Sequence, residues 1–351
     1  MSRLHFLDGL RGWAALSVLA NHTAYCFGGA WSNTWWGHLL SIFTDGRAAV
    51  TLFFCVSGFA ISRIPPESAL RFCLARYPRL AIPAACATCF SWLVQPTHSV
   101  LEFLLFNAST GFFLFFSSIA PSYVANSGVS QIPWYTPDWN ITPGRSHGVV
   151  LWTMYYEMQG SFLVILYTLA LPHLERPRLL KALVTVALFV TQTHLFYFML
   201  GIWFSETYTV PRRRVWLYFL GFISLHYLNH FQQIWLADVY ALHKLLYEII
   251  QSLRCVLLFA CIQPESSLQL FMQNRVSQWV GSLSFPIYLL HSWARDFSQL
   301  VNPTHNEGVL FAQTLLLALP VAQAFTHVDG WAIRKSKDVA AYFIKPTNCI
   351  V

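Results

Sequence analysis

Residues 7–22 read LDGLRGWAALSVLANH, an apolar run that carries an aspartate, an arginine and a histidine. On a helix, His22 follows Arg11 by eleven residues, which is about 1100° of rotation and roughly 16 Å along the axis. The two side chains therefore fall within about 20° of one stripe, and Asp8 lies one turn before Arg11 on the same face. Ionisable groups inside an apolar span usually face a protein interior or a water-filled cavity, so this stripe predicts a functional site. The alternative is that Asp8 and Arg11 anchor the helix end while His22 hydrogen-bonds a neighbouring helix.

The composition is typical of a membrane protein. Hydrophobic residues make up 56% of the 351 residues and charged residues only 11%, against about 25% charged residues in soluble domains. No polar stretch is long enough for an aqueous domain, so we predict one transmembrane domain over residues 1–335 and a short cytoplasmic tail over 336–351. The net charge of +7 comes from short basic clusters between apolar runs, which argues against nucleic-acid binding.

The eight cysteines are scattered and mostly lie in apolar runs, so a disulfide framework is not expected. Cys86 and Cys89 form a CxxC pair, but there is no second pair and no nearby histidine to complete a metal site. We therefore predict no metal and no permanently bound cofactor.

A membrane-crossing helix needs about 20 apolar residues, and the sequence predicts an all-α bundle of about ten such helices. They fall near residues 7–27, 47–64, 76–95, 149–171, 181–194, 195–208, 213–230, 244–263, 276–294 and 308–327. The stretch 181–208 barely covers two crossings, so it can also be tilted, re-entrant or a single broken helix. Residues 101–120 are a further apolar segment, either interfacial or re-entrant. Counting it as a crossing would reverse the predicted membrane orientation of every later helix.

Basic residues favour the cytoplasmic side of a membrane protein. With ten crossings and both termini cytoplasmic, all four basic clusters, near residues 63–79, 176–181, 212–214 and 334–337, fall on that side. Nine or eleven crossings would place at least one cluster outside. The sequence thus predicts a multi-pass protein of the inner or plasma membrane, with the loop 117–148 facing away from the cytoplasm.

Four later segments accompany the first one in a fixed order. They are VTLFFCVSGFAISR (50–63), ARYPRL (75–80), LWTMYYEMQGSFLV (151–164) and FPIYLLH (285–291). Together with the arginine, ten residues and histidine of the first helix, they make the chain similar to the membrane-bound acyltransferase 3 family. The chain departs from that family at Thr51, where members often carry an aspartate, and it resembles the stand-alone form without an SGNH domain.

The resemblance implies an O-acyltransferase that takes an acyl group from acyl-CoA, such as acetyl-CoA. Acyl transfer to a hydroxyl needs a base, and His22 suits this role because an imidazole titrates near neutrality. An acyl-histidine intermediate at His22 is the alternative. Arg76 and Arg79, the RxxR pair, can contact the phosphates of the acyl carrier, although positive-inside bias alone would also place them there. Arg11 either binds the pyrophosphate end of the carrier or pairs with Asp8.

Three more residues belong to the predicted site or its surroundings. Glu157 lies in an apolar helix and needs a partner across the bundle: it can orient His22, bind the acceptor or make an interhelical hydrogen bond. Ser57 is expected to pack between helices rather than act as a nucleophile. His291 matches the family without an obvious chemical need.

The family analogy makes a cell-surface carbohydrate the leading acceptor, and small lipids, polyketides and other secondary metabolites remain alternatives. Trp134, Tyr135 and Trp139 in the outer loop can stack on sugar rings, but such aromatics are also common at membrane interfaces. The expected partners are acyl-CoA, a hydroxyl acceptor and membrane lipid. The rival function is a transporter or flippase, against which stands the absence of an inverted repeat or a matching pair of broken helices.

Overall fold

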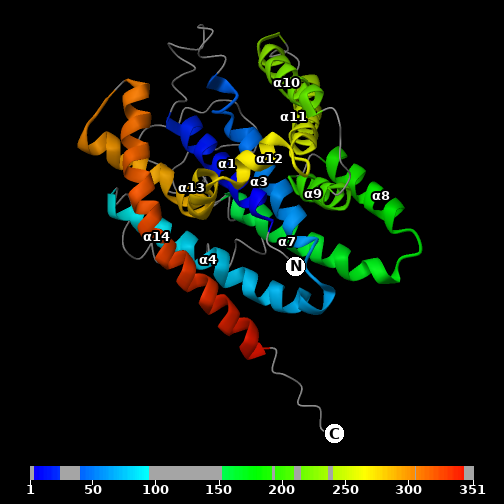
Figure 1. Cartoon of the computed structure of the whole chain (residues 1–351). Helices are drawn as coiled ribbons and strands as arrows, with labels where there is room; N and C mark the ends of the chain where they lie inside the picture. The colour runs from blue at the N-terminus through cyan, green and yellow to red at the C-terminus, as the bar shows by residue number, and fades with distance from the viewer. Residues whose placement is uncertain are drawn as a thin grey trace. The chain divides into compact units, whose positions relative to one another are not determined.

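The computed structural model of the chain describes residues 4–23, 40–94, 152–191, 194–208, 215–235, 240–304 and 306–343. In these ranges the protein is helical and contains no strand, which confirms the predicted all-α class (Figure 1). The α-helices are α1 (His5–Thr23), α3 (Gly46–Ile61), α4 (Ala69–Val94), α7 (Trp152–Ala170), α8 (Pro177–Val190), α9 (Leu195–Thr207), α10 (Val215–Trp235), α11 (Tyr240–Cys261), α12 (Ser267–Gln273), α13 (Arg275–Val301) and α14 (Glu307–Phe343). Two 3-10 turns, η2 (Pro66–Ser68) and η3 (Leu171–His173), complete the described elements.

Each of the ten predicted spans overlaps one α-helix, and several of these helices extend beyond the predicted bounds. The uncertain stretch 181–208 forms two helices, α8 and α9, of 14 and 13 residues. Each is about 20 Å long, which is shorter than the bilayer core of about 30 Å. The short helix α12 was not predicted, and the segments 101–120 and 117–148 lie outside the described residues.

Among the described helices, α14 alone is both long and apolar enough to cross a membrane. It has 37 residues, with a mean hydropathy of 1.7 over its most apolar 18-residue window. Only 28% of that window is buried by the rest of the protein, as expected of a helix that faces lipid. The helix continues to Phe343, past the boundary predicted at residue 335.

The chain divides into two compact units, and each is described by itself. The first unit consists of Met1–Asn21, Tyr25–Pro66 and Gly160–Ser284, and the second of His22–Ala24, Glu67–Gln159 and Phe285–Val351. Helices α1, α7 and α13 contribute residues to both.

In the first unit, α3 packs on α9 and α10 packs on α11 (Figure 1). The backbones of α3 and α9 meet at two glycines. A Cβ atom on Gly58 would lie 2.2 Å from the Phe198 carbonyl oxygen, and one on Gly201 would lie 2.2 Å from the Cys55 carbonyl oxygen. No larger residue fits at either position without moving a helix.

A face of α8 in the first unit is exposed and apolar. Leu179, Leu183, Val186 and Val190 are 50 to 71% exposed, and their spacing places them on one stripe of the helix. Large apolar stripes are rarely exposed to water, so this face suits contact with lipid.

In the second unit, α4 is the main neighbour of α14 (Figure 1). The buried positions of α14 recur mostly at every fourth residue: Leu310, Thr314, Ala318, Ala322, Phe325, Ala332, Ser336 and Ala340. Most are small, which lets a second helix approach closely. Phe325 and Phe90 of α4 meet edge to face, with ring centroids 6.1 Å apart.

Candidate active site

His22 lies in the last turn of α1, and the structure brings it together with His291 of α13 in the second unit. His22 Nδ1 is 2.7 Å from His291 Nε2, and the ring centroids are 4.9 Å apart. His22 is half-buried and His291 is completely buried. His22 Nε2 has no hydrogen-bond partner among the described residues.

Backbone carbonyl groups one turn earlier in α13 hold the His291 ring. Its Nδ1 lies 3.2 Å from the Ile287 carbonyl oxygen and 2.8 Å from the Tyr288 carbonyl oxygen. One turn further along α13, Arg295 Nη1 is 3.4 Å from the carbonyl oxygen of His22. The sequence motif FPIYLLH thus supplies the partner of His22. Arg295, one turn after this motif, connects α13 to the C-terminal end of α1.

Tyr288 connects the histidine pair to α7. Its hydroxyl lies 2.9 Å from the Thr153 hydroxyl, and its ring centroid is 6.0 Å from that of His291. Glu157 follows Thr153 by one helical turn and interacts electrostatically with Tyr288. Residues of α1, α7 and α13 therefore form one continuous chain of contacts in the second unit.

Glu157 has the partner across the bundle that the sequence required, and this partner is Arg76 of α4. The two form an ion pair in which the side chains are only 11% and 13% exposed. The Arg76 guanidinium also lies 5.6 Å from the centre of the Phe72 ring. Glu157, which was predicted to take part in the chemistry, and Arg76, which was predicted to bind the acyl carrier, thus form one ion pair.

Arg79 differs from Arg76 in being exposed. It interacts electrostatically with Asp329 of α14, whose Oδ1 is buried and has no hydrogen-bond partner among the described residues. Of the RxxR pair, Arg79 is therefore the one whose side chain reaches solvent.

Three predicted residues, Asp8, Arg11 and Ser57, belong to the first unit. Arg11 Nη2 lies 3.5 Å from Ser57 Oγ, a long contact between α1 and α3. Ser57 is 4% exposed and precedes Gly58, at which α3 meets α9. Ser57 is thus buried beside the contact between α3 and α9.

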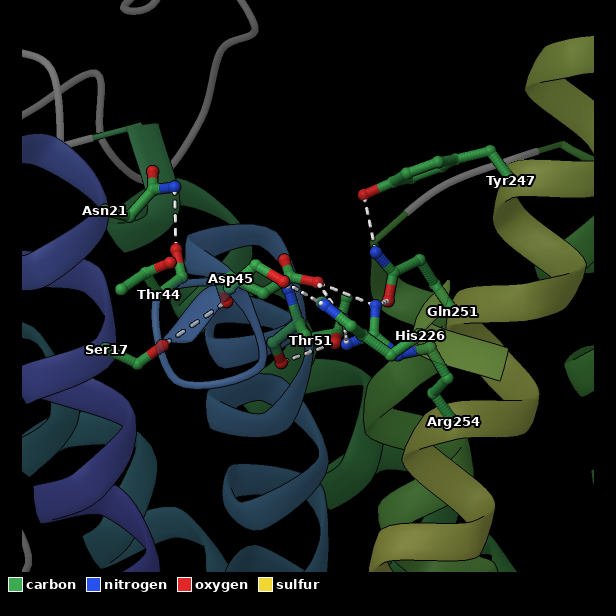
Figure 2. Close-up of polar contacts among 11 residues, drawn as sticks. Ser17, Asn21, Thr44, Asp45, Thr51, His226, Tyr247, Gln251 and Arg254 are labelled. Carbon is green, nitrogen blue, oxygen red and sulfur yellow. Dashed lines mark hydrogen bonds and ion pairs between the residues drawn. The ribbon is translucent and has the colours of Figure 1, made fainter. Parts of the chain in front are cut away.

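A buried cluster of charges in the first unit was not predicted (Figure 2). Arg254 of α11 is 1% exposed, and its Nη1 lies 2.7 Å from Asp45 Oδ2. Its Nη2 lies 2.8 Å from His226 Nδ1, and His226 Nε2 lies 2.8 Å from Ser41 Oγ. We name Asp45, His226 and Arg254 the arginine cluster.

Asp45 directly precedes α3 and caps it by accepting a hydrogen bond from the Ala48 N–H at 2.9 Å. Burial alone would raise the pKa of its carboxyl, but the Arg254 guanidinium and the Ala48 N–H hold this pKa well below its usual range. Asp45 is therefore a carboxylate, and its charge balances that of Arg254.

The chain segment that carries Asp45 of the arginine cluster also contacts α1. Asn21 Nδ2 donates to the Thr44 carbonyl oxygen at 2.8 Å, and Ser17 Oγ lies 3.5 Å from the Asp45 carbonyl oxygen (Figure 2). Asn21 immediately precedes His22. A signal for the cluster was present in the sequence, because Arg254 interrupts the apolar run of α11, but neither of its partners is near it in the chain.

No group of three or more histidine, cysteine or acidic residues that could hold a metal ion occurs in the ranges described above. Cys86 and Cys89 are free thiols.

Among the described residues, the protein is helical, one helix is long and apolar enough to cross a membrane, and His22 and His291 lie in contact. The family model of the acyltransferase domain, Acyl_transf_3, matches residues 4–327. The chain therefore belongs to this acyltransferase family, whose members are membrane proteins, and the predicted family is confirmed. No curated protein and no solved structure matches it significantly.

Proposed function

We propose that this chain is an O-acyltransferase that moves an acetyl or other short acyl group from acyl-CoA to a hydroxyl acceptor, with a cell-surface carbohydrate as the leading acceptor. The observation that carries the proposal is the contact of His22 Nδ1 with the buried His291, which leaves His22 Nε2 without a partner among the described residues, in a chain that belongs to an acyltransferase family. An oriented imidazole with a free nitrogen is what proton removal from a hydroxyl requires.

In the proposed reaction, the acceptor oxygen attacks the thioester carbonyl while His22 Nε2 takes the hydroxyl proton. The carbon–sulfur bond then breaks, and the proton passes from His22 to the departing thiolate. The products are the acyl ester and CoA with a free thiol. General-base catalysis of this kind contributes about 10²–10⁴-fold to a rate.

The charged residues of the second unit support a role in binding the carrier. Arg79 is exposed and can meet the phosphates of CoA directly. Arg76 is held by Glu157, and we assign Glu157 the role of holding this guanidinium in place. Arg11, on the α1 stripe that leads to His22, is proposed to bind the pyrophosphate end of the carrier.

We further propose ten membrane crossings within residues 1–335, a short tail after them, and both termini on the cytoplasmic side of the inner or plasma membrane. The apolar face of α8 and the low burial of α14 support contact with lipid. This topology presents the basic ends of α4 and α14 to cytoplasmic acyl-CoA.

The test uses the purified full chain in nanodiscs with radiolabelled acetyl-CoA and pooled envelope glycans. Wild type should transfer label and release CoA, whereas His22→Ala should lose about 10²–10⁴-fold of the turnover. Arg11→Ala should raise the KM for acetyl-CoA, and His327→Ala, which removes an exposed imidazole on α14, should behave as wild type.

Equal turnover in His22→Ala and wild type would refute the base assignment. No acyl transfer by a folded wild-type protein to any acceptor pool would refute the enzyme itself.

A further inference from the structure

The protonation of the histidine pair follows from the atoms around it. Carbonyl oxygens only accept hydrogen bonds. Because His291 Nδ1 faces the carbonyl oxygens of Ile287 and Tyr288 at 3.2 and 2.8 Å, this nitrogen carries a hydrogen. A neutral His291 then has a lone pair on Nε2.

The contact at 2.7 Å between His291 Nε2 and His22 Nδ1 joins an acceptor to a donor. Since His291 supplies the lone pair, His22 must supply the N–H from Nδ1. The lone pair of a neutral His22 is then on Nε2, the nitrogen with no partner among the described residues.

The reverse arrangement, in which His291 Nε2 donates to His22, would require a doubly protonated His291. That ring would be a completely buried cation. Its described contacts are two carbonyl groups and His22, and the charged group that acts on it is the like-charged Arg295. A buried cation without a counter-charge is costly, so the neutral pair is the stable arrangement.

We infer that His291 is a positioning residue that fixes His22 in the Nδ1–H tautomer and so directs the basic Nε2 of His22 toward the acceptor hydroxyl. This inference rests on the proposed acyl transfer at His22 and gives a role to a histidine that the sequence motif left without one. His291 has no lone pair free for substrate, because its Nδ1–H and its Nε2 are both engaged.

Two substitutions separate this role from simple packing. In His291→Gln, the amide oxygen takes the place of Nε2 and can still accept the His22 Nδ1–H bond. His291→Leu has similar bulk but no acceptor, so His22 is free to adopt either tautomer. Imposing the wrong tautomer on a catalytic histidine costs up to about 10⁴-fold in kcat, and a free tautomer should cost less.

The expected result is a fall of at least about tenfold in kcat for His291→Leu, with the KM for acetyl-CoA nearly unchanged, because His291 orients the base and is not assigned to binding the carrier. His291→Gln should retain kcat within about threefold. Thermal unfolding of each variant shows whether it is folded. A folded His291→Gln variant that loses as much kcat as His291→Leu would overturn the inference, and so would a folded His291→Leu variant with wild-type kcat.

A second measurement does not depend on activity. In protein labelled with ¹³C,¹⁵N-histidine, the ring shifts of His22, assigned by comparison with His22→Ala, report which nitrogen carries the hydrogen. Wild type and His291→Gln should show the Nδ1–H tautomer, and His291→Leu a mixture. An Nε2–H tautomer in wild type would disprove the inference without any variant, and this reading stands even if no acyl transfer is found.

Discussion

The histidine pair of the second unit and the arginine cluster of the first unit both place polar groups among apolar helices, but they differ in how charge is balanced. In the cluster, a carboxylate faces a guanidinium at 2.7 Å, so opposite charges compensate each other. In the pair, two neutral rings share one hydrogen bond, and His22 Nε2 has no described partner. Removing one partner of a buried ion pair leaves an uncompensated charge, whereas the lone pair of a neutral imidazole can take a proton from a substrate. The arginine cluster, although buried and charged, is therefore not where we place the chemistry.

The strongest test of this contrast removes the guanidinium of the arginine cluster. Arg254→Leu leaves Asp45 as a buried carboxylate without its counter-charge, and breaking a buried ion pair costs about 3–5 kcal/mol of stability. We expect a large fall in the unfolding temperature measured in detergent micelles. Adding Asp45→Asn, which keeps an N-cap side chain for α3, should recover most of the loss. If Arg254→Leu unfolded like wild type but had lost turnover, the cluster would belong to the chemistry and the contrast would fail.

A smaller effect is expected at the Arg76–Glu157 pair, whose side chains keep 11% and 13% exposure. Glu157→Gln leaves Arg76 without its charge partner and should cost about 1–3 kcal/mol of stability. The double variant Glu157→Gln/Arg76→Gln should be more stable than the single one. At saturating acetyl-CoA, its kcat should be near that of wild type, because we assign Glu157 to holding Arg76. A folded double variant with a kcat as low as that of His22→Ala would show instead that Glu157 acts on the substrate or on His22.

The helices were predictable because apolar length is a local property of the chain. Each predicted span overlaps a helix, while α12, with only seven residues, is too short to produce such a signal. His22 could be singled out for the same reason, since an ionisable residue stands out in an apolar run.

The partners of these residues could not be predicted, because they depend on contacts between distant parts of the sequence. His291 is 269 residues from His22, and Arg76 is 81 residues from Glu157. The sequence required a partner for Glu157 without identifying it. Arg254, like His22, is an ionisable residue in an apolar run, so its burial was predictable. Its pairing with Asp45, 209 residues away, was not.

A moderate effect on binding is expected at Arg79, whose side chain is exposed. A charge-assisted hydrogen bond to a phosphate contributes about 1.5–3 kcal/mol, so Arg79→Gln should raise the KM for acetyl-CoA by at least about tenfold. Its kcat and unfolding temperature should stay close to those of wild type. Arg275→Gln, which removes another exposed arginine, is the matched control. An unchanged KM in Arg79→Gln would assign this residue to membrane topology alone.

The smallest effect is expected at Ser57, the one buried serine of the second-helix motif, which would be a rival nucleophile. Its contact with Arg11 is long, at 3.5 Å, and its position next to Gly58 places it at the packed surface between α3 and α9. Ser57→Ala keeps a small residue there, so it should cost at most about 1 kcal/mol of stability and leave kcat within about threefold of wild type. A loss of kcat comparable to that of His22→Ala, in a protein that unfolds normally, would mean that acyl transfer passes through a serine ester in the first unit. His22 Nε2 would then serve a different step, and the contrast between the arginine cluster and the histidine pair would fail.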